Sequence, residues 1–394
     1  MSCFTAFSLT FLLGLAGPAA HAAPPGADSV RQVVAATLRR HVLAEARWAM
    51  RQAPVTVTAS HSPRSAGGAH DFFSEGDYWW PDPAHPGGPY VQRDGLTNPE
   101  NFTAHREALI RFSRVVGALG SAYRLTGKSR YAQHARLHLR AWLLDSATYM
   151  RPALPFAQAI QGRFTGRGIG IIDTLQLLEV VQAVLVMQAA GELPADELAG
   201  IRRWFARYLA WLTTHPYGLA ERNAPNNHGT CWTLQVAAFA RLTGDAARLD
   251  SCRLRYHTVL LPRQMAADGS FPRELQRTKP YGYSLFNLDA FAALCEVLRT
   301  PTDNLWTYQL PDGRGMARGV AYLAPYVADK RRWPLPPDVM YWADWPVAQP
   351  FLVLGAARLG NAGWLRTWQR LNHDPQVPEV LRNLPLRNPL LWLD

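Results

Sequence analysis

The sequence has few cysteines, which excludes a disulfide-rich scaffold. Four occur among 394 residues, and Cys3 lies in an apolar N-terminal segment, so the body of the chain keeps Cys231, Cys252 and Cys295. Three cysteines allow at most one intrachain disulfide, and their spacing is not that of a metal site. A chain of this length buries a core large enough to fold without covalent links, so we expect buried thiols.

Long apolar runs and metal-binding patterns are also missing. Residues 169–190 approach the roughly 18 apolar residues that a membrane span needs, but Asp173, Gln176, Glu179 and Gln182 interrupt them. The 12 histidines form no pair at metal-binding spacing with a nearby carboxylate. We therefore expect no metal and no cofactor, with calcium held by loop oxygens as the remaining alternative.

The N-terminus does carry an apolar segment. Phe7–Leu15 is an apolar run, and Ala20-His21-Ala22 provides the small residues of a signal peptidase site. The segment has no Lys or Arg, so only the amino terminus supplies positive charge. The pattern predicts a signal peptide over residues 1–22, and one catalytic domain over residues 23–394. The mature protein is then expected to be soluble and periplasmic or secreted.

Positive charge exceeds negative charge in the chain. Lys and Arg number 41 against 30 Asp and Glu, which gives a formal net charge of +11. Such a chain attracts polyanions. The basic residues are dispersed and no nucleic-acid-binding signature accompanies them, so we expect an acidic polysaccharide as the partner and not nucleic acid. A basic surface that serves only solubility remains the alternative.

Apolar residues recur at helical spacing through most of the chain. Helices are predicted at residues 29–52, 104–126, 129–146, 169–190, 195–214, 229–242, 246–265, 284–299, 315–327, 345–359 and 362–372. No run alternates as a strand does, and no fixed-period repeat indicates an open solenoid. The predicted fold class is therefore all-α, with helical hairpins closed into an (α/α) toroid. Residues 55–99 lack periodicity and are rich in Gly, Pro, His and aromatic residues, which predicts a long ordered loop lining a cleft.

Three polar and aromatic segments break the helical pattern: Asp77–Pro83, Asn226–His228 and Phe271–Tyr283. Cleaving a uronic-acid polymer by β-elimination requires neutralising the C6 carboxylate, removing the proton on C5 and protonating the departing O4. An amide and an Arg suit the first step, His or Tyr suits the second, and Tyr suits the third. The side chains that supply this set are Asn227, His228, Arg277 and Tyr283.

These segments resemble the alginate lyase superfamily, whose members carry Asn-Asn-His at a helix start, an Arg after Glu-Leu and a Tyr one or two turns later. Here the pieces are Asn226-Asn227-His228, Glu274-Leu275-Gln276-Arg277 and Tyr283, and the resemblance extends from about residue 77 to about residue 290. It implies an (α/α) toroid that cleaves a β-1,4-linked uronic-acid polymer, alginate or glucuronan, and leaves 4,5-unsaturated ends. It also implies that Asn227 and Arg277 neutralise the carboxylate, that His228 is the base or orients the substrate, and that Tyr283 is the acid or both acid and base.

The resemblance is incomplete at two points. In the superfamily the Asn-Asn-His motif continues with Ser-Tyr-Trp, whereas this chain has Gly229-Thr230-Cys231-Trp232, and the interval from Arg277 to Tyr283 is one residue shorter. Such differences are typical of a divergent branch in which alginate and glucuronan lyases both occur. Tyr281 is also a rival to Tyr283.

The stereochemistry of the sugar leaves two routes open. β-D-Mannuronate and β-D-glucuronate place the C5 proton and O4 on the same side, so a single Tyr serves both ends. Guluronate is inverted at C5, and there His228 is the more suitable base. Mannuronate, guluronate and glucuronate all remain candidate substrates.

Further residues are predicted to bind the substrate, through aromatic faces for sugar rings or through polar groups for carboxylates: Tyr78, Trp79, Trp80, Arg163, Arg167, Asn226, Lys279 and Tyr281. Two other functions remain as alternatives. One is a glycoside hydrolase, which needs two facing carboxylic acids, drawn from Asp77, Asp82, Glu100, Asp173, Glu274 and Asp289. The other is a non-catalytic polyuronate-binding protein.

Overall fold

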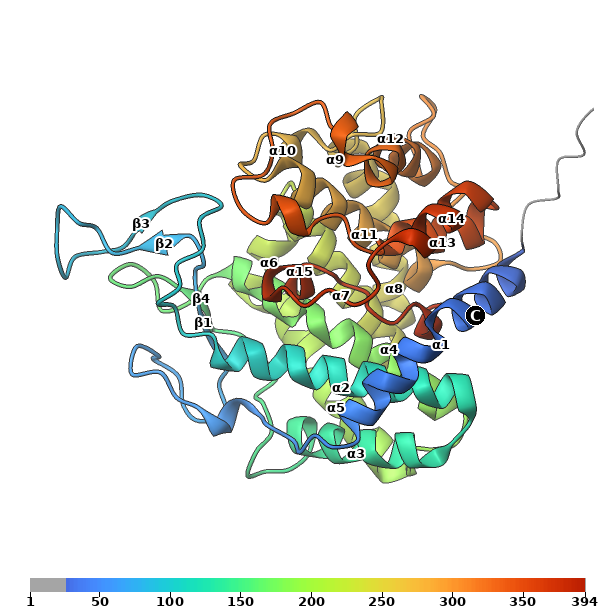
Figure 1. Ribbon diagram of the computed structural model, residues 1–394. Helices are drawn as coiled ribbons and strands as arrows, with labels where there is room; N and C mark the ends of the chain where they lie inside the picture. The colour runs from blue at the N-terminus through green and yellow to red at the C-terminus, as the bar shows by residue number, and fades with distance from the viewer. Residues whose placement is uncertain (1–25, 394) are drawn as a thin grey trace, which may run out of the picture.

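The computed structural model describes residues 26–393, so the predicted signal peptide lies outside the described residues. Helices make up most of this part of the chain (Figure 1). They are α1 Ala27–Ala49, α2 Ala104–Thr126, α3 Ser129–Leu143, α4 Leu177–Ala189, α5 Ala195–Thr214, α6 Pro216–Arg222, α7 Asn227–Thr243, α8 Ala246–Arg255, α9 Leu261–Gln264, α10 Pro272–Leu275, α11 Pro280–Leu298, α12 Met316–Ala328, α13 Pro350–Leu359, α14 Ala362–Arg370 and α15 Pro378–Arg382.

Six of these helices form a closed ring. Helices α1, α2, α4, α7, α11 and α13 contact one another in that order, and α13 returns to α1. Helices α3, α5, α8, α12 and α14 pack on the outside of their ring neighbours. Helices α4, α7 and α11 are enclosed by other elements on several sides, which is why they are apolar around most of their circumference. The prediction of an all-α toroid is confirmed.

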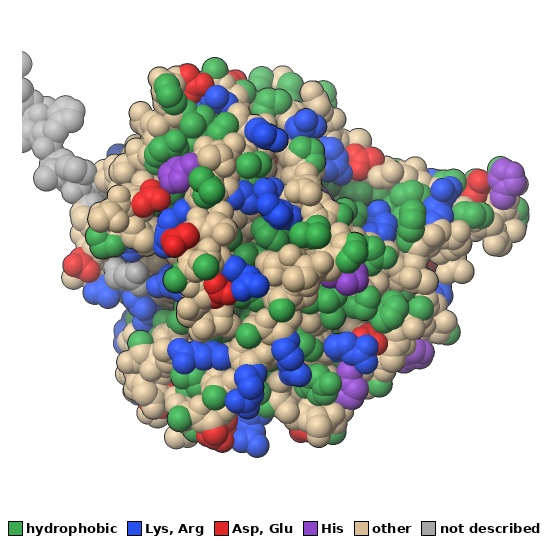
Figure 2. Space-filling model, turned by 180° about the vertical axis from the view of Figure 1, so that it is seen from behind, with side chains coloured by type: hydrophobic (Ala, Val, Ile, Leu, Met, Phe, Trp, Pro, Cys, Tyr) green, Lys and Arg blue, Asp and Glu red, His purple; other side chains and the backbone are tan. Residues whose placement is uncertain are grey.

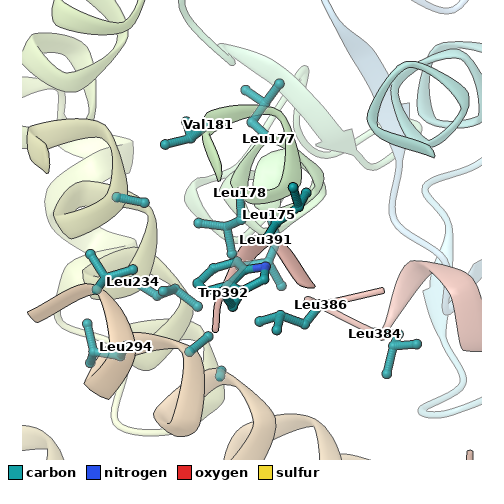
Figure 3. Packing of buried hydrophobic residues seen from close by; sticks show 14 of the residues in the cluster. Leu175, Leu177, Leu178, Val181, Leu234, Leu294, Leu384, Leu386, Leu391 and Trp392 are labelled. Atoms are coloured by element: carbon teal, nitrogen blue, oxygen red, sulfur yellow. The ribbon is translucent and has the colours of Figure 1, made fainter. Parts of the chain in front are cut away.

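The last described residues pack against the inner ring. Leu391 and Trp392 lie among Leu178 of α4, Leu234 of α7 and Leu294 of α11 (Figure 3). The indole nitrogen of Trp392 donates a hydrogen bond to the buried carboxylate of Glu179 at 3.1 Å. The 3-10 turn Pro389–Leu391 contacts α1, α2, α4 and α13. This C-terminal segment, residues 384–393, therefore ties several helices of the ring together.

Four short strands project from one end of the helical body (Figure 1). Strand β1, Phe73–Glu75, pairs in parallel with β4, Phe156–Ala159. Strand β2, Trp79–Trp80, pairs antiparallel with β3, Val91–Gln92. Three of the four lie in the predicted loop of residues 55–99, which is ordered as expected and more strand-like than the sequence indicated.

Some predicted helix boundaries were wrong. The helix predicted at 246–265 is interrupted by a π-helical turn at Tyr256–Leu260, and the one at 169–190 begins as a 3-10 helix, Gly168–Gln176. Helix α13 starts at Pro350 rather than at residue 345, because proline lacks the N–H for a helical hydrogen bond and is best accommodated in the first turn of a helix. Helix α11 starts at Pro280, earlier than predicted, for the same reason.

Two compositional predictions can be compared with the structure. Cys231, Cys252 and Cys295 are buried free thiols, as expected. Among the described residues one helical stretch, Gly168–Ala189, is long and apolar enough to cross a membrane, but 78% of its apolar window is buried in the fold, as in the core helix of a globular protein. On the face shown in Figure 2, Lys and Arg side chains are spread over the surface rather than gathered in one patch.

Candidate functional site

A cavity of about 450 Å³ brings together distant parts of the chain. Its walls come from the β2–β3 region, from residues 158–172, from the start of α7, from the start of α11 and from the end of α15. The volume is in the range that binds small molecules or a few sugar units. All four predicted catalytic side chains line it: Asn227, His228, Arg277 and Tyr283.

Asn227 is held by a buried carboxylate. It is the first residue of α7, and its backbone nitrogen and its side-chain Nδ2 donate to the two oxygens of Glu274, each at 2.7 Å. The start of a helix favours a negative charge, because its backbone N–H groups are unpaired. Burial nevertheless raises the pKa of Glu274, against the hydrogen bonds from Asn227 that lower it. The second Nδ2 hydrogen of Asn227 stays available to a ligand in the cavity.

His228 is oriented by a second buried carboxylate. Its Nδ1 lies 2.6 Å from Oε1 of Glu221, which lies in the last turn of α6 and is 1% exposed. A carboxylate only accepts, so Nδ1 carries the proton and Nε2 is the nitrogen that remains for a ligand. Burial disfavours the charged ring, but the charge and hydrogen bond of Glu221 outweigh it, and the pKa of His228 is raised above 6.5.

Replacing Glu221 with Gln should lower the pKa of His228, because the substitution removes the charge that favours the imidazolium form. NMR titration of the His228 ring, assigned with His228→Asn, measures this shift. Asp303→Asn, which removes the carboxylate beside His257, is the matched control and should leave the His228 midpoint in place. An unchanged midpoint in Glu221→Gln would show that Glu221 does not set this equilibrium.

Arg277 and Tyr283 form one unit in the wall of the cavity. The guanidinium lies 4.3 Å from the centre of the Tyr283 ring, and its NH2 group donates to the Tyr283 hydroxyl at 3.2 Å. The same NH2 donates to Asp94 at 2.8 Å. This pairing leaves further N–H groups of Arg277 for a ligand, since a guanidinium carries five donors.

The Tyr283 hydroxyl also lies 2.7 Å from the hydroxyl of Tyr78. Burial raises the pKa of Tyr283 well above its usual value, and the nearby Tyr78 raises it further, whereas Lys279 and Arg277 lower it. The phenol is therefore neutral at neutral pH and able to donate a proton. A negative charge that develops on the Tyr283 oxygen is stabilised by Arg277, whose guanidinium donates a hydrogen bond to it.

Arg167 is the cation of the cavity that lacks a carboxylate partner among the described residues. Its guanidinium donates to the carbonyl oxygen of Gln158 at 2.8 Å and lies 5.8 Å from the centre of the Trp79 ring. A Cβ at Gly76 would come within 2.7 Å of the Trp79 ring and 2.9 Å of the guanidinium, so a larger residue there would displace both side chains. Gln158 adopts a left-handed backbone with φ of 48° to place its carbonyl. Burial lowers the pKa of Arg167 to about 10, which leaves it charged at neutral pH.

Buried ion pairs support the wall of the cavity behind Tyr78. Asp77 accepts from Arg106 at 2.7 Å and from Arg382 at 2.6 Å. Arg106 also lies 3.5 Å from Asp173. Burial opposes the charged form of Asp77, but the two arginines outweigh it and hold its pKa below the usual range. Arg382 comes from α15, so this network joins the strand region to the C-terminal part of the chain.

The predicted substrate-binding residues separate into two groups. Tyr78, Trp79, Arg167 and Asn226 line the cavity. The others do not line it: Trp80, Arg163, Lys279 and Tyr281.

The four exceptions have other surroundings. The Trp80 indole donates to Leu96 at 2.9 Å, and Arg163 donates to the carbonyl of Tyr90 at 2.8 Å, outside the cavity. Lys279 is buried behind Tyr283 in an ion pair with Glu379. Tyr281 is fully buried, and its hydroxyl donates to the carbonyl of Tyr326 at 3.1 Å. Tyr281 is therefore not a rival to Tyr283 for access to a ligand in the cavity.

Several residues of the site had no counterpart in the sequence prediction: Asp94, Glu221, Arg382 and Asn383. Glu221 stands seven residues before His228, but the non-helical residues 223–226 between α6 and α7 interrupt the helical periodicity. Asp94 lies in a segment without helical or strand periodicity, and Arg382 lies about a hundred residues beyond the last recognised segment. The spacing of these residues in the sequence does not predict that they lie close together in the fold.

The sequence model for alginate lyases matches residues 56–333. The crystal structure of an alginate lyase from Bacteroides ovatus has 28% sequence identity and a TM-score of 0.79, and the alignment covers 94% of this chain and 99% of that chain. A histidine-to-alanine variant of alginate lyase A1-III complexed with tetrasaccharide shares the fold, at 15% identity and a TM-score of 0.58 over 90% of this chain and 94% of that chain. No curated protein sequence matches the chain.

Proposed function

The chain belongs to the alginate lyase family, a family of polysaccharide lyases, and we propose that it cleaves a β-1,4-linked polyuronate, alginate or glucuronan, by β-elimination. The observation that carries this proposal is the meeting of an amide, an imidazole, a guanidinium and a phenol in one cavity. Each corresponds to a step of the elimination, and no metal ion or cofactor is required by this set.

Neutralising the uronate carboxylate is the first requirement. In this proposal Arg277 and the free Nδ2 hydrogen of Asn227 bind that carboxylate, so that charge moving into it from C5 is stabilised. Glu274 and Asp94 fix the two side chains before the substrate arrives. This preorganisation avoids reorientation during the reaction.

Proton transfer is the second requirement. Tyr283 donates its proton to O4 as the glycosidic bond breaks, and Arg277 stabilises the phenolate that forms. With mannuronate or glucuronate, Tyr283 reacts first as the phenolate that Arg277 stabilises: it takes the C5 proton and then passes that proton to O4, because both positions lie on one side of the sugar. With guluronate, Nε2 of His228 takes it, supported by Glu221.

The positions and partners of the carboxylates argue against a glycoside hydrolase. Of the six considered for that role, only Asp77 lines the cavity, and two arginines bind it. Glu274 is occupied by Asn227, and Asp289 accepts from Gln349 and from the backbone of Phe351. A hydrolase needs two facing carboxyl groups with room for a water or a sugar between them, and these groups do not provide it.

The test uses the purified mature protein with polymannuronate, polyguluronate and glucuronan in separate incubations. A lyase produces an unsaturated uronate, which is detected by its ultraviolet absorbance. New reducing ends without that absorbance would indicate a hydrolase instead. Retention on an immobilised polyuronate, with neither absorbance nor new ends from any polymer, would indicate a binding protein.

Arg167→Met should raise KM about 10- to 100-fold with a smaller effect on kcat, since a charge-assisted hydrogen bond contributes about 1.5–3 kcal/mol. Arg167 faces the cavity as a cation without a carboxylate partner among the described residues, so it suits the carboxylate of a neighbouring sugar. Arg163→Met is the matched control, because Arg163 covers the same Trp79 ring at 5.5 Å from outside the cavity. Equal changes in KM for both variants would contradict the assignment.

A further inference from the structure

Lys279 occupies an unusual position directly behind Tyr283. Its ammonium nitrogen lies 5.1 Å from the ring centre of Tyr78, 5.5 Å from that of Tyr283 and 5.4 Å from that of Tyr341. It forms an ion pair with Glu379 at 2.8 Å, and both side chains are 7% exposed. Lys279 does not line the cavity, so it does not contact a ligand there.

A buried ion pair of this kind needs an explanation. Removing a Lys and a Glu from water costs several kcal/mol per ion, and apolar residues of similar size often give equal or greater stability. Glu379 belongs to α15, beyond the residues matched by the family model, and it also contacts Arg382 at 3.3 Å. The structure therefore places one buried cation and one buried anion at the rear of the phenol that exchanges protons.

We propose that Lys279 and Glu379 are positioning residues that set, with opposite signs, how readily Tyr283 gives up its proton. This inference rests on the proposed function, because it concerns the proton transfer in that reaction. Tyr283 is a phenolate for part of the cycle in both routes described above. An ammonium close to its ring stabilises the phenolate, and a carboxylate beside that ammonium offsets part of the effect.

Other charged or titratable groups surround the Tyr283 phenol, and they remain constant in the comparison. They are Tyr78 and Arg277 at the hydroxyl, Asp94 behind Arg277, Arg382 beside Glu379, and Asp338 near Lys279. Lys279 and Arg277 both lower the pKa of Tyr283, against the larger effect of burial. Of these two cations, Arg277 lines the cavity and Lys279 does not. A substitution of Lys279 therefore changes the charge near Tyr283 without removing a contact with the substrate.

The experiment measures kcat and KM against pH for the wild-type protein, Lys279→Met, Lys279→Arg and Glu379→Gln. The limb of the kcat profile that belongs to His228 is identified first as the one that moves in Glu221→Gln. In Lys279→Met the other limb should move to higher pH, and kcat at neutral pH should fall about tenfold on polymannuronate or glucuronan, where Tyr283 first acts as the base, as expected for about one pKa unit. KM should change less than kcat, because the ammonium does not touch the substrate.

Two variants separate this role from a merely structural one. Lys279→Arg keeps the charge and should restore most of the wild-type profile, whereas Glu379→Gln should move the limb to lower pH. Circular dichroism and thermal unfolding verify that each variant is folded. If Lys279→Met does not fold, the opposite displacement in Glu379→Gln still decides the question.

The inference is overturned if the limb stays in place in both charge variants, or if both move it in the same direction. A wild-type protein that is inactive on all three polymers overturns the proposed function, and this inference with it. An active wild-type protein with unmoved limbs overturns the inference alone. The two failures are therefore distinguishable.

Discussion

Replacing Tyr283 with Phe should lower kcat by about 10²- to 10⁴-fold, the range that general acid–base catalysis contributes. The substitution removes only the hydroxyl that lies 3.2 Å from Arg277 and 2.7 Å from Tyr78, so the ring continues to fill its place. No other hydroxyl in the cavity has the same contact with Arg277. Production of unsaturated uronate, followed by ultraviolet absorbance, measures the loss.

Tyr281→Phe is the matched control for this prediction. Tyr281 lies two residues earlier in α11, and it also loses one buried hydroxyl, in this case one that binds the Tyr326 carbonyl. Its activity should stay within a few-fold of the wild-type value, because its side chain does not reach the cavity. If Tyr281→Phe lost as much activity as Tyr283→Phe, Tyr283 could not be the specific proton donor.

Replacing Asp77 with Ala should lower the free energy of unfolding by about 3–5 kcal/mol, the usual cost of removing one partner from a buried ion pair. The side chain of Asp77 is 4% exposed, and its loss leaves Arg106, 8% exposed, and Arg382, 17% exposed, without the charge that lies between them. Chemical denaturation at neutral pH measures the change. Activity should fall as well, since Tyr78 follows Asp77 directly in the cavity wall.

The exposed pair in the same loop provides a control. Asp82→Ala removes a carboxylate that binds His85 at the surface, and a surface pair of this kind contributes little to stability.

The pKa of Asp77 is lowered in the folded state, so its contribution is present above its unfolded pKa of about 3.9 and is lost as the pH falls below it. The stability difference between wild type and Asp77→Ala should therefore shrink in acid. A difference that stays constant down to acid pH would contradict this account.

The sequence was sufficient for the class of fold and for the centre of the site. Helical periodicity is a local property, so α2 and α5 were predicted with their observed boundaries. The polar segments at residues 226–228 and 277–283 interrupt that periodicity at helix starts, where side chains turn toward a common edge. Both segments line the cavity, and their catalytic roles remain a proposal to be tested.

The error at Tyr281 has a geometric cause. Because Pro280 is the first residue of α11, Tyr281 and Tyr283 are both helical and point about 200° apart. The sequence predicted a helix start at residue 284, which put Tyr281 and Tyr283 in a segment without regular structure. The directions of their side chains could therefore not be predicted. Lys279 was misplaced for the same reason, since it is the residue immediately before the helix and points behind Tyr283.

Other parts of the site depend on contacts that no local pattern encodes. Arg382 joins Asp77 across about three hundred residues of sequence, and Gln158 adopts a left-handed backbone that glycine, rather than glutamine, usually takes. Such features arise from tertiary packing. They are visible only when the ring of helices has brought the segments together.

The C-terminal segment has a consequence for the order in which the protein is made. Residues 382 and 383 complete a wall of the cavity, and Leu391 and Trp392 pack against the ring, yet a ribosome adds them after all other parts of the site. A nascent chain that has emerged only as far as α14 holds Tyr283, His228 and Arg106 but lacks Arg382, the second of the two cations that bind Asp77. A product that ends just before α15 would therefore carry Tyr283 and His228 without a complete cavity wall.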